Sequence, residues 1–360
     1  MCSGYSIMLL SLPLRRHAKQ GRIQGNMDVV MANKRIEYLD VVKLFTIYLV
    51  ILGHVVGYID PTLEISGSLH YFIYSFHMPL FMLLCGYFVT SMNKPFLEML
   101  SKKAKQLLLP AITCTAICCV YLYFFRTHVN FRDEIIGNSW FLKVLFVYYI
   151  FFYFLRKIKI NEWLLFIVVC IILFVIPKGS TLQVNLLFPY FIGGYMLRKY
   201  NVLEKYGKSS ILLFIMFLLF LVSLLYLCYN NIPEYVPVNY NTLHDCYFII
   251  LMRYLVGFSG SLFFILLISK SDIFLSGMKL YNKMALYGRY TLGIYVLQTI
   301  LVVNIFPDIV EWNMQNEILL NFVVAPLISL FVLLICIIMI KLLSSSRNLD
   351  ILMFGGQYSK

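Results

Sequence analysis

The sequence predicts an all-α protein, a polytopic integral membrane bundle of about ten transmembrane helices with both termini in the cytoplasm. Its 360 residues are 61% hydrophobic and only 13% charged, and the mean hydropathy is +0.81. Soluble domains are about 45–50% apolar and about 25% charged. Apolar stretches also recur along the chain, with basic residues gathered at alternate breaks. Most of the chain is therefore expected to lie in lipid.

The apolar stretches are the predicted membrane spans. A helix of about 20 residues crosses a hydrocarbon core about 30 Å thick. All but two stretches meet this length, and 162–177 and 184–197 are short. In chain order the predicted spans are 41–59, 69–91, 105–125, 139–155, 162–177, 184–197, 209–229, 245–269, 287–306 and 317–340.

The distribution of basic residues orients these spans. With the N-terminus inside, 24 of the 30 Lys and Arg residues lie in cytoplasmic segments or at cytoplasmic span edges. The outside segments hold only Arg126, Arg132 and Lys178. Cytoplasmic loops of membrane proteins carry such an excess. Topology thus explains the net charge of +13, which gives no indication of nucleic-acid binding.

The two ends of the chain differ from its middle. Residues 1–34 are expected to be an extension that is disordered or upstream of the true start, with Met27 or Met31 preferred as the start. Its apolar patch precedes its basic residues, which reverses the order of a secretory signal. Residues 35–345 form the transmembrane domain, and 346–360 a cytoplasmic tail.

The cysteines give no indication of a metal site or a disulfide framework. The nine Cys residues are scattered, mostly inside the predicted spans, and no CxxC pair occurs. This pattern is typical of small core side chains.

Costly polar side chains lie at similar depth in several spans, and such groups are candidate functional residues. At 1.5 Å per residue, His54 lies roughly 8 Å below the outer end of the first span. His77 lies roughly 12 Å below the outer start of the second. Lys143, Arg253 and Gln298 also fall in the outer halves of their spans. The five side chains together predict one polar cavity.

The first span also carries a basic residue below His54. Lys43 lies eleven positions earlier, so the two share a helix face about 16 Å apart. Asp40 is placed for an ion pair with Lys43. This face suits a long substrate that comes from the cytoplasm and presents its reactive end at His54. Lys43 and Lys143 are also compatible with lysines that extend to the membrane surface, and a lone histidine with one that bonds a neighbouring helix.

Several motifs in a fixed order resemble the acyltransferase-3 family of membrane acyltransferases. The stretch that begins at Arg35 continues to Lys43, ten further residues and His54, and the second span contains the run FHMPLF at 76–81. Weaker matches follow at 107–110, 139–142, 191–195 and 290–295. This chain has Gln298 where many members have His.

The resemblance implies an O-acyltransferase in a bacterial inner membrane. It would move an acyl group, usually acetyl, from acetyl-CoA to a hydroxyl of a cell-surface or lipid-linked glycan. Acetyl-CoA would be a co-substrate rather than a bound cofactor, and the other partners would be the glycan and membrane lipid.

The same resemblance and the chemistry of the side chains divide the candidate residues. His54 either deprotonates the acceptor or carries the acyl group briefly, and His77 supplies a second proton step or stabilises the oxyanion. The catalytic candidates are His54, His77 and Arg253, and the candidates for binding acyl-CoA or acceptor are Arg35, Asp40, Lys43, Lys143 and Gln298.

Two other functions are compatible with many helices around a polar cavity. One is a transporter or flippase of a lipid-linked sugar, although the chain shows no convincing internal repeat. The other is a membrane glycosyltransferase or glycan polymerase, although the chain has no long outside loop. Covalent modification of the glycan with consumption of acyl-CoA distinguishes the acyltransferase from a flippase.

Overall fold

The computed structural model describes residues 36–58, 64–89, 95–126, 130–158, 161–175, 183–233, 240–309 and 316–359. Within these ranges the chain is helical and contains no strand. The all-α prediction is therefore confirmed. The predicted N-terminal extension, together with Met27, Met31 and Arg35, lies outside the described residues.

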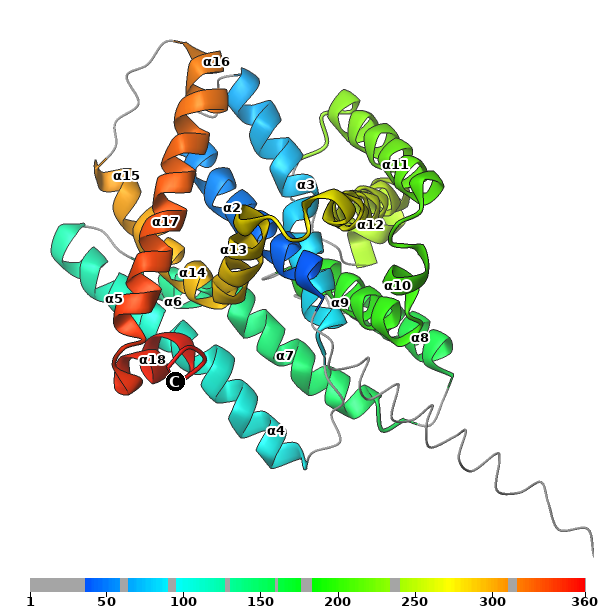
Figure 1. Ribbon diagram of the computed structural model, residues 1–360. Helices are drawn as coiled ribbons and strands as arrows, with labels where there is room; N and C mark the ends of the chain where they lie inside the picture. The colour runs from blue at the N-terminus through cyan, green and yellow to red at the C-terminus, as the bar shows by residue number, and fades with distance from the viewer. Residues whose placement is uncertain are drawn as a thin grey trace, which may run out of the picture. The chain divides into compact units, whose positions relative to one another are not determined.

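The helices follow the predicted spans (Figure 1). In chain order they are α2 (Glu37–Gly57), α3 (Glu64–Tyr87), α4 (Phe96–Lys103), α5 (Leu109–Phe125), α6 (Phe131–Gly137), α7 (Trp140–Leu155), α8 (Glu162–Val175), α9 (Val184–Lys199), α10 (Val202–Tyr206), α11 (Ser210–Tyr229), α12 (Tyr240–Leu275), α13 (Lys279–Tyr287), α14 (Thr291–Gln298), α15 (Phe306–Ile309), α16 (Glu317–Leu319), α17 (Ala325–Leu343) and α18 (Arg347–Phe354). Wider, π-helical turns join α4 to α5 (Ala104–Leu108), α14 to α15 (Thr299–Ile305) and α16 to α17 (Leu320–Val324).

Seven of the ten predicted spans match helices that are long and apolar enough to cross a membrane, and an eighth, 139–155, falls on a bent pair of helices. Seven stretches are long and apolar enough in the described part of the chain, and α6 with α7 forms an eighth if this pair, bent by 56°, is one span. The remaining two spans fall on α8 and α9, which have only 14 and 16 residues. They were the two short stretches in the sequence. The prediction of an integral membrane bundle is confirmed.

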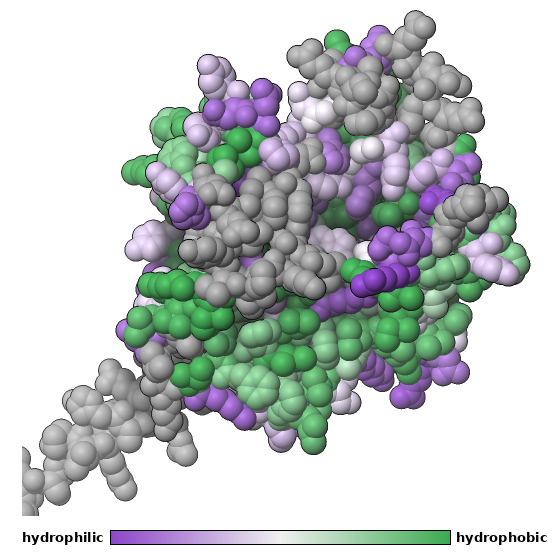
Figure 2. All heavy atoms as spheres, turned by 180° about the vertical axis from the view of Figure 1, so that it is seen from behind, coloured by the Kyte–Doolittle hydropathy of each residue, from purple (hydrophilic) through white to green (hydrophobic). Residues whose placement is uncertain are grey.

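The short helix α9 is enclosed by protein. Its residues 187–192 are all buried. A helix that is shielded from lipid in this way need not be as long as the hydrocarbon layer is thick. By contrast, α11 leaves most of its apolar side chains exposed. Figure 2 shows hydrophobic side chains gathered in a broad band across one face, with hydrophilic side chains above and below it. Such a band is what a hydrocarbon layer requires.

Two glycines let α3 and α9 pack backbone to backbone. A Cβ atom at Gly86 would lie 1.8 Å from the carbonyl oxygen of Phe191, and one at Gly194 would lie 1.9 Å from that of Leu83. Small residues at helix contacts are typical of membrane bundles, because they allow close van der Waals packing. On its other side α3 packs against α12. These contacts fix α3, which carries His77.

The segment predicted to be a cytoplasmic tail packs against α5 and α14 and belongs to the same compact unit, residues 38–360. The fully buried Asp350 accepts hydrogen bonds from the backbone N–H groups of Tyr358 (3.2 Å) and Ser359 (2.9 Å). The Tyr358 hydroxyl accepts one from Gly293 N–H in the first turn of α14, at 3.1 Å. Burial raises the pKa of Tyr358 well above its usual range, so the hydroxyl stays neutral at pH 7.

Candidate active site

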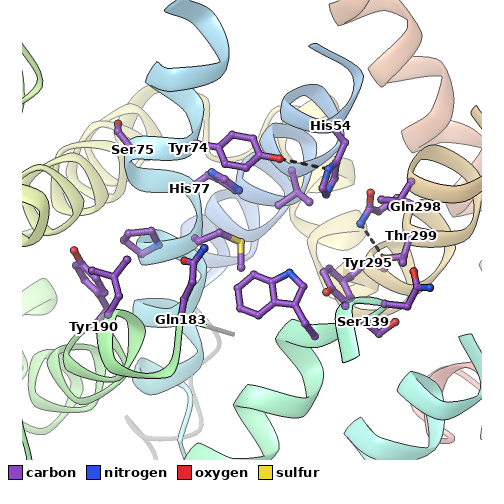
Figure 3. A pocket seen from close by; sticks show the side chains of 18 of the residues that line it. His54, Tyr74, Ser75, His77, Ser139, Gln183, Tyr190, Tyr295, Gln298 and Thr299 are labelled. Carbon is purple, nitrogen blue, oxygen red and sulfur yellow. Dashed lines mark hydrogen bonds between the residues drawn. The ribbon is translucent and has the colours of Figure 1, made fainter. Parts of the chain in front are cut away.

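A cavity of about 570 Å³ lies where several of these helices meet (Figure 3). Its volume is in the range of about 300–1,000 Å³ that ligand pockets have. Of the five polar residues that the sequence places at one depth, four line it, namely His54, His77, Arg253 and Gln298. The other described lining residues are Val50, Tyr74, Ser75, Met78, Pro79, Asp133, Glu134, Gly137, Asn138, Ser139, Trp140, Gln183, Leu186, Tyr190, Tyr295, Thr299 and Val303.

Tyr74 links the two histidines. Its hydroxyl lies 3.4 Å from Nδ1 of His54, as the dashed line in Figure 3 marks. Its ring meets that of His77 edge to face, with centroids 4.6 Å apart, and stacks on His70 at 3.9 Å. The sequence reasoning missed Tyr74. Its signal is the spacing of His70, Tyr74 and His77, which places the three on one face of a helix.

His77 is held in one tautomer. Its Nδ1 lies 2.8 Å from the carbonyl oxygen of Ile73, one turn earlier in α3. A carbonyl only accepts, so Nδ1 carries the hydrogen and Nε2 keeps its lone pair. The imidazole is buried, being 3% exposed, yet it lines the cavity. His77 therefore offers an oriented base to a ligand there.

Arg253 brings a positive charge from α12 to the cavity. It is only 6% exposed. Its Nη2 donates to the carbonyl oxygens of Ile232 and Pro233, and its guanidinium carbon lies 5.2 Å from the ring centre of Tyr71. Its Nε has no hydrogen-bond partner among the described residues. This N–H is thus a donor that a bound ligand can use.

Gln298 contributes an acceptor from the end of α14. The side chain is buried, and its Nε2 donates to the Thr299 hydroxyl at 3.1 Å. Its Oε1 has no partner in the described part of the chain. Directly after it comes the π-helical turn Thr299–Ile305, a type of irregularity that is frequent at functional sites.

Three more candidates, Asp40, Lys43 and Lys143, lie outside the described lining of this cavity. The expected ion pair between Asp40 and Lys43 is present at 3.0 Å, and the Lys43 ammonium lies 3.6 Å from the ring centre of Phe88. Lys143 donates to the carbonyl oxygens of Ile135 and Asn138 at the end of α6. The binding roles expected for these three charged residues and for Arg35 remain predictions.

No metal site is apparent in the described ranges, where no group of three or more His, Cys, Asp or Glu side chains is placed to hold an ion.

The membrane-spanning helices and a cavity lined by two histidines are compatible with a membrane enzyme that transfers a chemical group. The acyltransferase-3 family, described as an acyltransferase domain, matches residues 36–341. The chain belongs to this family of membrane acyltransferases.

Two curated proteins resemble part of the chain. Nodulation protein NolL of Mesorhizobium japonicum is 34% identical over 131 residues, which is 33% of this chain and 35% of NolL. NolL of Sinorhizobium fredii is 35% identical over 124 residues, 31% of this chain and 34% of that protein. The chain thus spans about a third of the length of these relatives. No solved structure matches it.

Proposed function

We propose that the protein is an O-acyltransferase of the bacterial inner membrane. In this proposal it moves an acetyl group from cytoplasmic acetyl-CoA to a hydroxyl of a cell-surface or lipid-linked glycan. Family membership supports the reaction class. The observation that carries the proposal is the placement of His54 and His77, from adjacent helices, in one cavity on either side of Tyr74.

The reaction needs one base and one path for the leaving group. The acceptor oxygen attacks the thioester carbonyl carbon, a C–O bond forms, and the C–S bond breaks. The hydroxyl proton passes to a histidine nitrogen, and the CoA thiolate leaves and takes up a proton. Nε2 of His77 is suited to the first step, because its lone pair is free. His54 serves as the second proton carrier or as a transient acyl carrier.

Two further groups are suited to charge and orientation. A developing oxyanion is stabilised by donors that are already in place. Arg253 offers such a donor in its unpartnered Nε–H. Gln298 Oε1 is an acceptor suited to orient a substrate hydroxyl.

Acetyl-CoA would approach from the cytoplasmic side of α2. CoA is polyanionic, so basic side chains there suit its phosphates. Lys43 lies on α2 beneath His54, and its bond to Asp40 would be exchanged for a phosphate. Arg35 and the lysines at 102, 103 and 105 add positive charge at the same predicted surface.

Transfer of labelled acetyl from acetyl-CoA to the glycan fraction of membranes tests this function. Membranes with matched amounts of wild type, His54→Ala and His244→Ala are compared; His244 is exposed and lies outside the cavity lining. We expect incorporation by wild type and His244→Ala, and a loss of about a hundredfold or more in His54→Ala. Equal labelling by all three would remove His54 from the mechanism. Glycan that moves across the membrane unlabelled would favour a flippase.

A further inference from the structure

The turn between α6 and α7 builds a second wall of the cavity, which the transfer steps do not use. The wall consists of Asp133 and Glu134 on α6, Asn138 and Ser139 in the turn, and Trp140 at the start of α7, all of which line the cavity. In Figure 3, Ser139 of this turn lies on the opposite side of the pocket from Tyr74. A substrate bound between this wall and the side of the cavity that carries Tyr74 would contact both.

Bonds from elsewhere in the chain hold this turn in place. Lys143 binds the carbonyl oxygens of Ile135 and Asn138, and Asn304 Nδ2 donates to Asn138 Oδ1 at 3.2 Å. Ser139 has a left-handed backbone, with φ of 53°. A non-glycine residue keeps this uncommon conformation where its surroundings hold it, which is frequent at ligand sites. The wall is therefore preformed.

Among the described residues, side-chain amides bind the two carboxylates of this wall. Asn130 Nδ2 donates to Asp133 at 2.7 Å, and Asn138 Nδ2 donates to Glu134 at 2.8 Å. An ionised carboxylate has about four acceptor sites, so each keeps capacity for a ligand. The buried Oε1 of Gln298, without a partner among the described residues, adds another acceptor to the same cavity.

The charge of the described lining is correspondingly negative. The described lining holds Asp133, Glu134 and one cationic side chain, Arg253, whose Nη2 is already bound to two carbonyl oxygens. The Lys143 ammonium, outside the lining, is likewise bound to the carbonyl oxygens of Ile135 and Asn138. A ligand that donates hydrogen bonds is favoured here, and an anionic group is not.

We infer that this wall, formed by α6, the turn and the start of α7, is the acceptor subsite and that it binds an uncharged sugar residue. The inference rests on the proposed function. Sugar hydroxyls donate to the carboxylates of Asp133 and Glu134, and the C–H face of the ring packs on the Trp140 indole. A sugar with a carboxylate or phosphate at this place would meet two like charges, which excludes it.

Fluorescence of Trp140 tests the subsite without turnover. The chain has three Trp residues, so Trp163→Phe with Trp312→Phe leaves only Trp140. The purified protein is titrated with the methyl glycosides of glucose, galactose and N-acetylglucosamine, and with those of glucuronate and galacturonate. We expect a saturable change with at least one neutral glycoside and none with the uronates. No response to any neutral glycoside, or an equal response to the uronates, would overturn the inference.

Charge removal then identifies the residues. Asp133→Asn with Glu134→Gln should weaken binding of the neutral glycoside about tenfold, because charged acceptors make the stronger hydrogen bonds. The same pair of changes should allow a response to the uronate. Glu317→Gln, an acid outside the cavity lining, should change neither. Equal effects of Glu317→Gln would assign the loss to a general change in charge and refute the subsite.

Failure of this inference is distinguishable from failure of the proposed function. If Trp140 responds to sugars but wild type transfers no acetyl group from acetyl-CoA or other acyl-CoA donors, the proposed function fails and a sugar-binding site stands. If wild type acetylates neutral and uronate acceptors alike, the subsite fails and the acyltransferase stands.

Discussion

At the scale of single residues, the two cavity histidines differ in how their ring nitrogens are engaged. His77 has its Nδ1–H fixed by a backbone carbonyl, whereas the partner of His54 Nδ1 among the described residues is the Tyr74 hydroxyl. The state of His54 therefore depends on Tyr74. If Nδ1 of His54 carries the hydrogen, the tyrosine oxygen accepts it, and Nε2 is the nitrogen left for chemistry.

The change Tyr74→Phe isolates this hydrogen bond, because it keeps the ring that stacks on His70 and meets His77. We expect kcat for acetyl transfer to fall about tenfold or more, with the KM for acetyl-CoA unchanged. Steady-state kinetics on protein in detergent measures both. Tyr123→Phe, at an exposed ring of α5, is the control and should have no effect. A kcat equal to wild type would show that Tyr74 has no part in positioning His54.

At the scale of helices, the position of His77 depends on how closely α3 approaches α9. The contact at Gly86 and Gly194 leaves no room for a side chain. A methyl group there must push the two backbones apart, and α3 would then shift with His77. The helix pair is thus a rigid support for one wall of the cavity.

We therefore expect Gly86→Ala to destabilise the protein by about 3 kcal/mol, the upper part of the usual cost of overpacking. Thermal unfolding in detergent, followed by near-ultraviolet circular dichroism, measures the change. Gly137→Ala is the matched control, since a Cβ there meets nothing within 4 Å and should alter stability by no more than about 1 kcal/mol. Equal unfolding temperatures for wild type and Gly86→Ala would contradict the close contact.

At the scale of the whole molecule, the segment after α17 completes the bundle. α18 packs on α5 and α14, and the following residues return to the carboxylate of Asp350. The Tyr358 hydroxyl then binds Gly293, at the start of the helix that ends in Gln298. The short helix α14 therefore connects this segment, which contacts its first turn, with the cavity, which Gln298 lines.

Asp350→Ala tests this closure. The change leaves the partly buried N–H groups of Tyr358 and Ser359 without their acceptor, and an unsatisfied buried donor costs about 1–3 kcal/mol. We expect limited proteolysis between residues 344 and 359 to accelerate about a hundredfold. Asp308→Ala breaks an exposed pair with Arg126 and should change the rate little. An unchanged cleavage rate for Asp350→Ala would show that other contacts hold the segment.

Sequence patterns predicted the parts of this structure that depend on lipid and on regular helix geometry. Hydropathy located the spans, helical spacing predicted the Asp40–Lys43 ion pair, and depth brought four polar residues to one cavity. The same patterns could not reveal the α6–α7 wall or the docking of α18. The wall depends on side-chain bonds at a helix break and on one contact with distant Asn304, and the docking of α18 depends on contacts with distant helices. Hydropathy and periodicity encode none of these.

The closure by Tyr358 also has a consequence for biosynthesis. During translation α14 is made about sixty residues before Tyr358. When α14 inserts, the N–H of Gly293 therefore still lacks the Tyr358 hydroxyl as its acceptor. We therefore expect α14, which carries Gln298, to reach its final position only after residue 358 has been made. A nascent chain arrested before that point would hold every catalytic candidate and still lack a finished cavity.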